Sequence, residues 1–184
     1  MATRPPDLHH SAYAQGINRG QSAVLAYALP WLSIMLGTLA PGILSIASAP
    51  LFPPIGFLML VSWRQLRPGL LPVWVGVPLG LFDDLYSGQP FGSAVLLWSA
   101  TMIIMEVVEL GFPWRSFIVD WLMASSIIVL YLLLALGLAN AGGGHVLIAQ
   151  ILPQVLFAML VFPLVGRLVG FLDRARLARF RTFK

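Results

Sequence analysis

The feature that most restricts the fold of this chain is the segment 116–138, a long apolar run with a single charged side chain, Asp120. A helix needs about 20 predominantly apolar residues to cross the hydrocarbon core of a bilayer, and this run is long enough. Of the 184 residues, 59% are hydrophobic and 10% are charged, whereas a soluble domain usually has about 25% charged residues. The sequence therefore predicts an all-α, polytopic membrane protein.

Other apolar runs predict further spans, so that we expect six transmembrane helices. These runs cover residues 21–39 (extending toward 48), 55–63, 69–86, 91–110 and 146–171. The run at 55–63 is short for a span, so it could tilt, thin the bilayer locally or lie partly re-entrant. The expected organisation is a flexible tail at 1–20, one membrane domain at 21–172 and a basic tail at 173–184.

The basic residues all fall on one side of this arrangement. With the N-terminus in the cytosol, all 11 lysines and arginines fall on the cytoplasmic side, in the two tails, in the loops after the second and fourth spans or, for Arg167, near the inner end of the sixth span. Because cytoplasmic loops are enriched in these residues, we expect both termini in the cytosol. Topology then explains the net charge of +4 without nucleic acid, and the C-terminal tail could also rest on anionic lipid of the inner leaflet.

Two adjacent carboxylates, Asp83 and Asp84, stand near the outer end of the third span. At helical spacing they share a face with Gly76 and Gly80, and such small residues let another helix approach closely. Ionisable groups at membrane depth usually face protein or an aqueous cavity. The pattern predicts that this face is buried against a neighbour, with the acids in helix packing or in contact with a partner.

The residues after the two acids predict a tight turn into the fourth span. Gly88 can supply a positive φ, and Pro90 fixes its own φ. Asp84 is placed to accept hydrogen bonds from backbone amides of this turn or of the next helix, whose N-terminus favours negative charge. The alternative is that both acids simply cap and hydrate a helix end. A catalytic pair is disfavoured, because no nucleophile or oxyanion donor set accompanies them.

A second group of charges is expected at the inner ends of the spans. Glu106 and Glu109 lie on one face of the fourth span, at the level of basic residues in the cytoplasmic loops. We expect an ion-pair network that locks spans two, four and five together; the alternative is that the glutamates only reach headgroup water. Asp120 shares a small, polar face of the fifth span and is expected to contact another helix. The candidate residues for this network are Arg64, Arg67, Glu106, Glu109, Arg115 and Asp120.

The sequence predicts no catalytic, cofactor or metal site. There is no cysteine, which excludes thiolate ligands and nucleophiles. His9 and His10 are adjacent in a tail, without the carboxylates that would complete a metal site. No phosphate-binding loop or dinucleotide fingerprint is present.

The segment GLFDDLYSGQPFG resembles a motif of the rod-shape-determining MreD family, Gly-Leu-x-x-Asp-x-x-x-Gly-x-x-x-Gly. The residues that match are Gly80, Leu81, Asp84, Gly88 and Gly92. Spacing to Gly88 favours Asp84 over Asp83 as the acid of the motif. The segments VSWRQLRP and GFPWR are also similar to the family, and the resemblance covers about residues 20–172.

The resemblance implies a non-enzymatic inner-membrane component of the bacterial cell-elongation complex, which supports cell shape and lateral peptidoglycan synthesis. The implied partners are the scaffold protein MreC, the actin-like MreB, the glycosyltransferase RodA and a penicillin-binding transpeptidase. The implied fold is similar to the S-components of energy-coupling-factor transporters, a likeness that does not establish transport.

The alternative is a small-molecule-binding subunit of a transporter, with an outward pocket. The polar groups available near the outer side for such a pocket are Asp83, Asp84, Ser87, Gln89, Ser93 and Asn140.

Overall fold

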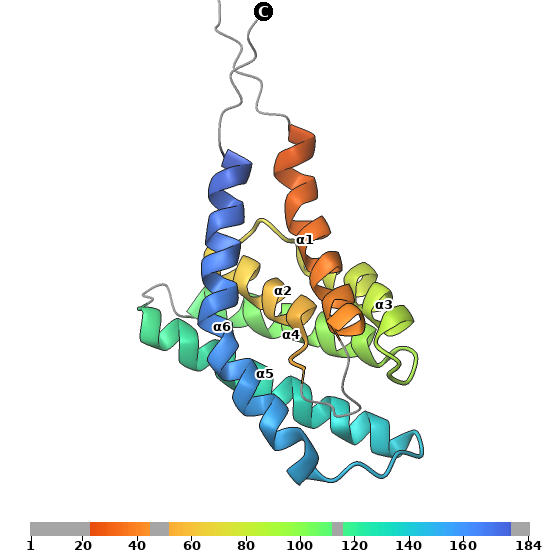
Figure 1. The fold of residues 1–184 in the computed structure, drawn as a ribbon. Coiled ribbons are helices and arrows are strands. Elements are labelled where there is room, and N and C mark those ends of the chain that lie inside the picture. Colours follow the sequence, from red (N-terminus) through yellow and green to blue (C-terminus); the bar gives the residue numbers. More distant parts are fainter. Residues whose placement is uncertain (1–22, 45–51, 112–115, 178–184) are drawn as a thin grey trace, which may run out of the picture.

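The computed structural model describes residues 23–44, 52–111 and 116–177, and the regular structure in these ranges is helical (Figure 1). The predicted all-α class is therefore confirmed. The elements are α1 (Ala23–Leu44), α2 (Ile55–Leu66), the 3₁₀ turn η1 (Val73–Val75), α3 (Gly76–Tyr86), α4 (Ser93–Gly111), α5 (Phe117–Ala141) and α6 (Ile148–Leu177).

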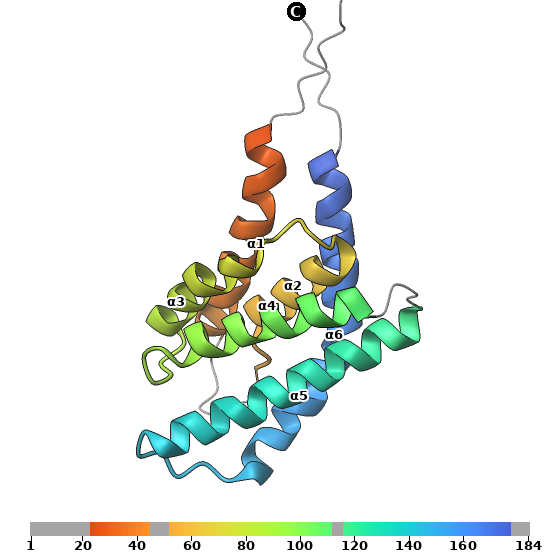
Figure 2. The same cartoon turned by 180° about the vertical axis from the view of Figure 1, so that it is seen from behind.

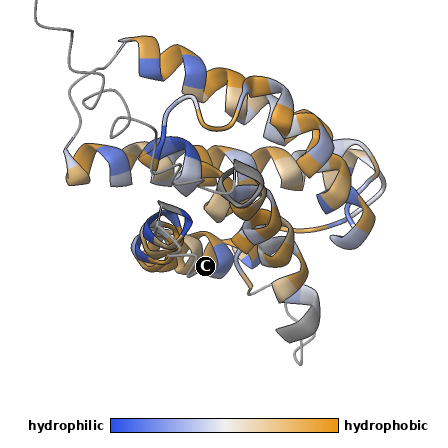
Figure 3. Cartoon of the chain, turned by 90° about the horizontal axis from the view of Figure 1, so that it is seen from above, coloured by the Kyte–Doolittle hydropathy of each residue, from blue (hydrophilic) through white to orange (hydrophobic). Residues whose placement is uncertain are grey.

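Several helices have the length and composition of membrane spans. Among the described residues, α4, α5 and α6 are long and apolar enough to cross a bilayer, and α2 is a shorter apolar helix. Hydrophobic residues, drawn in orange, run along the helices (Figure 3). These features are those of a membrane protein. Each predicted span contains a helix, and the third is divided between η1 and α3.

The short helix α2 lies at the centre of the molecule (Figures 1 and 2). Every residue from Gly56 to Arg64 is buried, and α2 packs against α1, α5 and α6. On its buried face, the ring of Phe57 stacks on Tyr131 of α5 with 3.9 Å between centroids. A helix that other helices surround need not match the thickness of the bilayer. This position accounts for the short length of α2, 12 residues.

The helices α3 and α4 pack closely against each other, and two glycines make the approach possible. A Cβ added to Gly76 would lie 2.8 Å from the Cα of Ser99, and one added to Gly80 would lie 2.7 Å from the carbonyl oxygen of Ala94. Both glycines are buried. The predicted burial of this face against another helix is confirmed, and the neighbour is α4 of the same chain.

A second close approach joins α1 to α2. A Cβ on Gly37 would lie 2.8 Å from the sulfur of Met59, and one on Gly56 would lie 2.9 Å from the backbone nitrogen of Thr38. The sequence analysis did not single out these glycines, because they stand alone in two different apolar runs rather than in one spaced pair.

Both described ends of the chain lie at the same end of the molecule. In Figures 1 and 2, the N-terminal part of α1 and the C-terminal part of α6 extend in the same direction, beyond the layer formed by α2, α3 and α4. The helix α6 continues to Leu177, so it includes the first residues of the predicted basic tail. The tail at 1–20 and residues 178–184 lie outside the described residues.

Gly80→Ala is expected to destabilise the protein, because the new methyl group would meet backbone atoms of α4 that cannot move independently. Overpacking of this kind costs about 1–3 kcal/mol. Gly137→Ala in α5 is the matched control, since a Cβ there meets nothing within 4 Å and alanine favours a helix more than glycine does. Thermal unfolding of both variants in the same detergent provides the measurement. Equal melting temperatures would contradict the close packing of α3 and α4.

Candidate functional site

The carboxylate of Asp84 caps the N-terminus of α4. Its Oδ2 accepts hydrogen bonds from the N–H of Gly92 at 2.9 Å and of Val95 at 3.2 Å, and its Oδ1 accepts one from the N–H of Ala94 at 2.8 Å. The hydroxyl of Ser93 donates a longer bond to Oδ1 at 3.4 Å. The prediction that Asp84 binds amides at the start of the next helix is confirmed.

These bonds complete the hydrogen bonding of the first turn of α4. The initial N–H groups of a helix have no partner within the helix. Here the N–H of Ser93 donates to the carbonyl of Pro90 at 3.0 Å, and that of Leu96 donates to Gly92 at 3.0 Å. The N–H groups of the two residues in between, Ala94 and Val95, donate to the carboxylate of Asp84. A negative charge is also favoured at a helix N-terminus by the helix dipole, so this buried carboxylate has a structural role.

The glycines of the turn allow the chain to return onto Asp84. Gly88 has φ +68° and Gly92 has φ +93°. Residues that have a Cβ rarely adopt such positive φ angles. The predicted positive φ of Gly88 is confirmed. In the MreD-like motif, Gly80, Asp84, Gly88 and Gly92 therefore each have a role in building the α3–α4 hairpin. The face of α3 that carries Gly76 and Gly80 is covered by α4, so it is not open to a partner.

Asp83, the neighbouring acid, has a different environment. Its side chain is only 8% exposed, and it lines a cavity of about 370 Å³. The cavity lies between the α3–α4 turn, the start of α2, and α1, α5 and α6. No ion pair to Asp83 is present among the described residues.

The cavity has more polar groups than the sequence analysis assigned to it. Ser87 and Gln89 of the predicted set line it, whereas Asp84 and Ser93 are used in the cap. Asn140 instead closes the α5–α6 loop, exchanging hydrogen bonds with Val146 at 2.9 and 3.0 Å. The polar residues that the sequence analysis missed are Thr38, Tyr86, Tyr131 and Gln154.

At the opposite end of the bundle, Arg64 is the centre of a buried charge cluster. Its side chain is 1% exposed, and its Nη2 contacts the carboxylate of Glu106 and lies 2.9 Å from that of Glu109. Its Nη1 donates to the carbonyl of Leu71 at 2.6 Å. The structure thus brings together three residues of the predicted network and joins α2 to α4.

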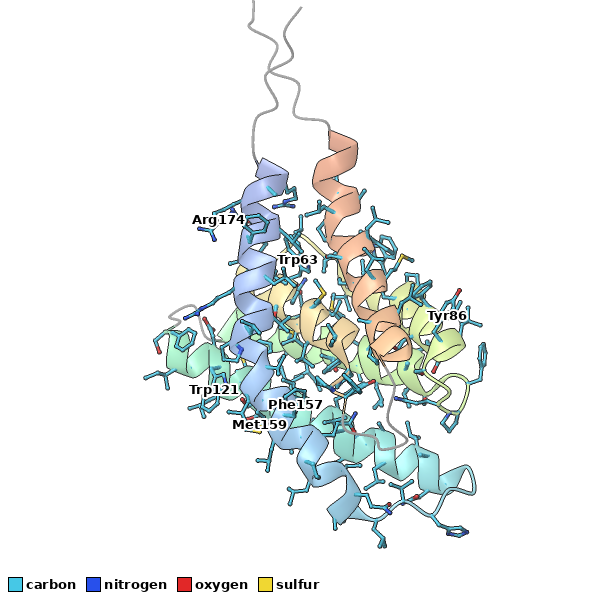
Figure 4. All side chains as sticks on the ribbon, viewed as in Figure 1. Trp63, Tyr86, Trp121, Phe157, Met159 and Arg174 are labelled. Atoms are coloured by element: carbon cyan, nitrogen blue, oxygen red, sulfur yellow. The ribbon has the colours of Figure 1, made fainter. Side chains whose placement is uncertain are left out.

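Arg67, predicted to join the same network, pairs elsewhere. Its guanidinium donates to Asp173 of α6 at 2.9 and 3.1 Å. Asp173 also accepts from Arg176 at 2.7 Å, and the Arg176 guanidinium lies 5.7 Å from the ring centroid of Trp63. Trp63 appears beside α6 in Figure 4. This second cluster joins the end of α2 to α6, a connection that the sequence analysis did not predict.

Two residues of the predicted network remain, Arg115 and Asp120. Arg115 lies outside the described residues. The backbone carbonyl of Asp120 accepts a hydrogen bond from Gln65 of α2 at 2.9 Å, as expected for a residue at a helix contact. Asp120 also lines a second cavity of about 390 Å³ between α2, α5 and α6. Near it, Trp121 donates from its indole nitrogen to the Met159 carbonyl at 3.3 Å (Figure 4).

The fold and the two charged regions define a helical membrane protein whose polar groups mainly join its own helices. Among the described residues, no group of three or more histidines and acids could hold a metal ion. Comparison with protein-family models, with curated proteins and with solved structures gave no match.

Proposed function

We propose that the chain is a non-enzymatic inner-membrane component of the bacterial cell-elongation complex, of the MreD type, that binds an MreC-like scaffold protein. The observation that carries the proposal is that the residues of the MreD-like motif form one structural unit. Gly80 permits contact with α4, Asp84 caps α4, and Gly88 and Gly92 supply the positive φ angles of the turn. A motif with these joint roles is more specific than scattered identities.

The proposed topology has six crossing helices and both termini in the cytosol. It is supported by the common position of the two described chain ends (Figure 1) and by the basic residues Arg64, Arg67 and Arg176, which gather toward one end of the bundle. Because basic residues favour the cytoplasmic side, that end faces the cytosol.

The partner contact falls on the outer surface of the bundle in this proposal, because α4 covers the glycine face of α3. One exposed apolar stripe runs along α4, at helical spacing. Its residues are Leu96, Ile103, Val107 and Leu110. An MreC-like transmembrane helix could pack on such a stripe, and MreB, RodA and the transpeptidase would then associate through the same complex.

Depletion of the protein from rod-shaped cells is expected to round them, and wild-type chain purified from native membrane should retain an MreC-like protein. Asp84→Ala should reach the membrane but retain less of this partner and fail to restore rods, since the α3–α4 hairpin holds α4 in place. Asp83→Asn is the matched control that leaves the cap intact and should restore rods. Unchanged cell shape on depletion, with no scaffold protein retained, would refute the proposal.

A second candidate is the small-molecule-binding subunit of a transporter, similar to an S-component. The cavity beside Asp83 favours it, because a recess with several convergent polar groups is typical of ligand sites. Uptake of a small molecule that depends on the chain, with normal cell shape in its absence, would support this candidate over the first.

A further inference from the structure

Among the described residues, Asp83 is a buried acid for which neither an ion pair to an arginine nor a hydrogen bond from a backbone amide is found. The carboxylate of Asp84 is bound by backbone amides, and Glu109 and Asp173 are bound by arginines. Asp83 is similarly buried, and Thr38 of α1 lines the same cavity as Asp83. No lysine, arginine or histidine is found among the described residues that line its cavity.

We propose that this cavity is a binding site for a small organic cation, with Asp83 as its counter-ion. A charge buried away from water is costly unless it is paired. A positively charged ligand would supply the pairing that the chain itself does not. The proposal does not depend on the partner-binding role, since binding of an amine is measured on the chain alone.

The size and walls of the cavity suit such a ligand. Its volume of about 370 Å³ lies in the range of small-molecule sites, about 300–1,000 Å³. Aromatic rings of Phe52, Tyr86 and Tyr131 line it, and ring faces attract organic cations. Tyr131 is held in place by stacking on Phe57.

The amide groups of the cavity add hydrogen-bond acceptors. Gln154 donates from its side-chain nitrogen to the carbonyl of Phe52 at 2.8 Å, which leaves its oxygen to accept a bond from an ammonium group. Gln89 reaches the cavity from the α3–α4 turn. The site therefore combines one carboxylate, aromatic faces and neutral acceptors, a set that favours a protonated amine over an anion.

The test uses the full chain in lipid nanodiscs with pairs of probes that have the same shape and differ in charge. The pairs are phenethylamine with 2-phenylethanol, and choline with its neutral analogue 3,3-dimethylbutan-1-ol. Equilibrium dialysis should show saturable binding of at least one cation, at one per chain, and weaker binding of its neutral partner. Asp83→Asn should weaken binding of that cation about thirtyfold or more.

Asp120→Asn is the control, because it makes the same change at the second cavity and should leave the affinity for the cation unaltered. Thr38→Val, which keeps the shape of the side chain but removes its hydroxyl, should weaken binding less than Asp83→Asn. The proposal is overturned by any of three results. They are no saturable binding of either cation in the millimolar range, equal affinity for charged and neutral probes, or a loss in Asp120→Asn that matches the loss in Asp83→Asn.

Discussion

Asp84→Ala is expected to lower the free energy of unfolding by about 3 kcal/mol. Loss of a helix cap costs about 0.5–2 kcal/mol, and each buried N–H left without a partner adds a cost of about 1–3 kcal/mol. Asp84 is 6% exposed and accepts from three backbone N–H groups, so water cannot readily replace it. Unfolding by sodium dodecyl sulfate in mixed micelles measures the change.

The neighbouring acid provides the matched control for this experiment. Asp83→Ala removes an equally buried carboxylate that accepts no backbone N–H bond among the described residues, so we expect a much smaller loss of stability. Asp84→Asn should lie between the two, because an amide retains one acceptor oxygen and loses the charge favoured by the helix dipole. Equal losses for Asp83→Ala and Asp84→Ala would show that the cap does not stabilise the hairpin.

The sequence predicted the cap because its partners are close in the chain. Gly92, Ala94 and Val95 lie 8, 10 and 11 residues after Asp84, so one turn brings them to the carboxylate. The approximate positions of the helices were predictable for a similar reason, since apolar runs are local. Local patterns therefore sufficed for this hairpin, where the partners are about ten residues apart in the chain.

Several of the contacts that the sequence analysis missed join distant elements. Arg67 and Asp173 are 106 residues apart, and charge spacing alone favoured the nearer acids Glu106 and Glu109. The cavity at Asp83 depends on Thr38 and Gln154, which come from the two ends of the membrane domain. Hydropathy also cannot distinguish contact with lipid from contact with protein. The central position of α2 among the other helices therefore could not be predicted from its apolar sequence.

Arg64→Met is expected to have the largest effect on stability of any single change considered, about 3–5 kcal/mol, because removal of one partner leaves buried charges unpaired. The Glu109 side chain is 13% exposed and would lose its arginine, while the Leu71 carbonyl would lose its donor. Glu106 is 47% exposed and can reach solvent, so most of the cost falls on Glu109 and Leu71. Unfolding in mixed micelles again provides the measurement.

Two further variants separate the role of charge from that of packing. Arg64→Lys keeps the charge, but a single ammonium group cannot reproduce the fork that reaches both glutamates and the Leu71 carbonyl, so it should still lose stability. Adding Glu109→Gln to Arg64→Met removes the unpaired acid, and we expect it to recover part of the loss, since a buried ion pair can often be replaced by neutral groups at little cost. If the double variant is as unstable as the sum of the single variants, the ion pair is not what joins α2 to α4, and the packing of the Arg64 stem would have to account for the loss.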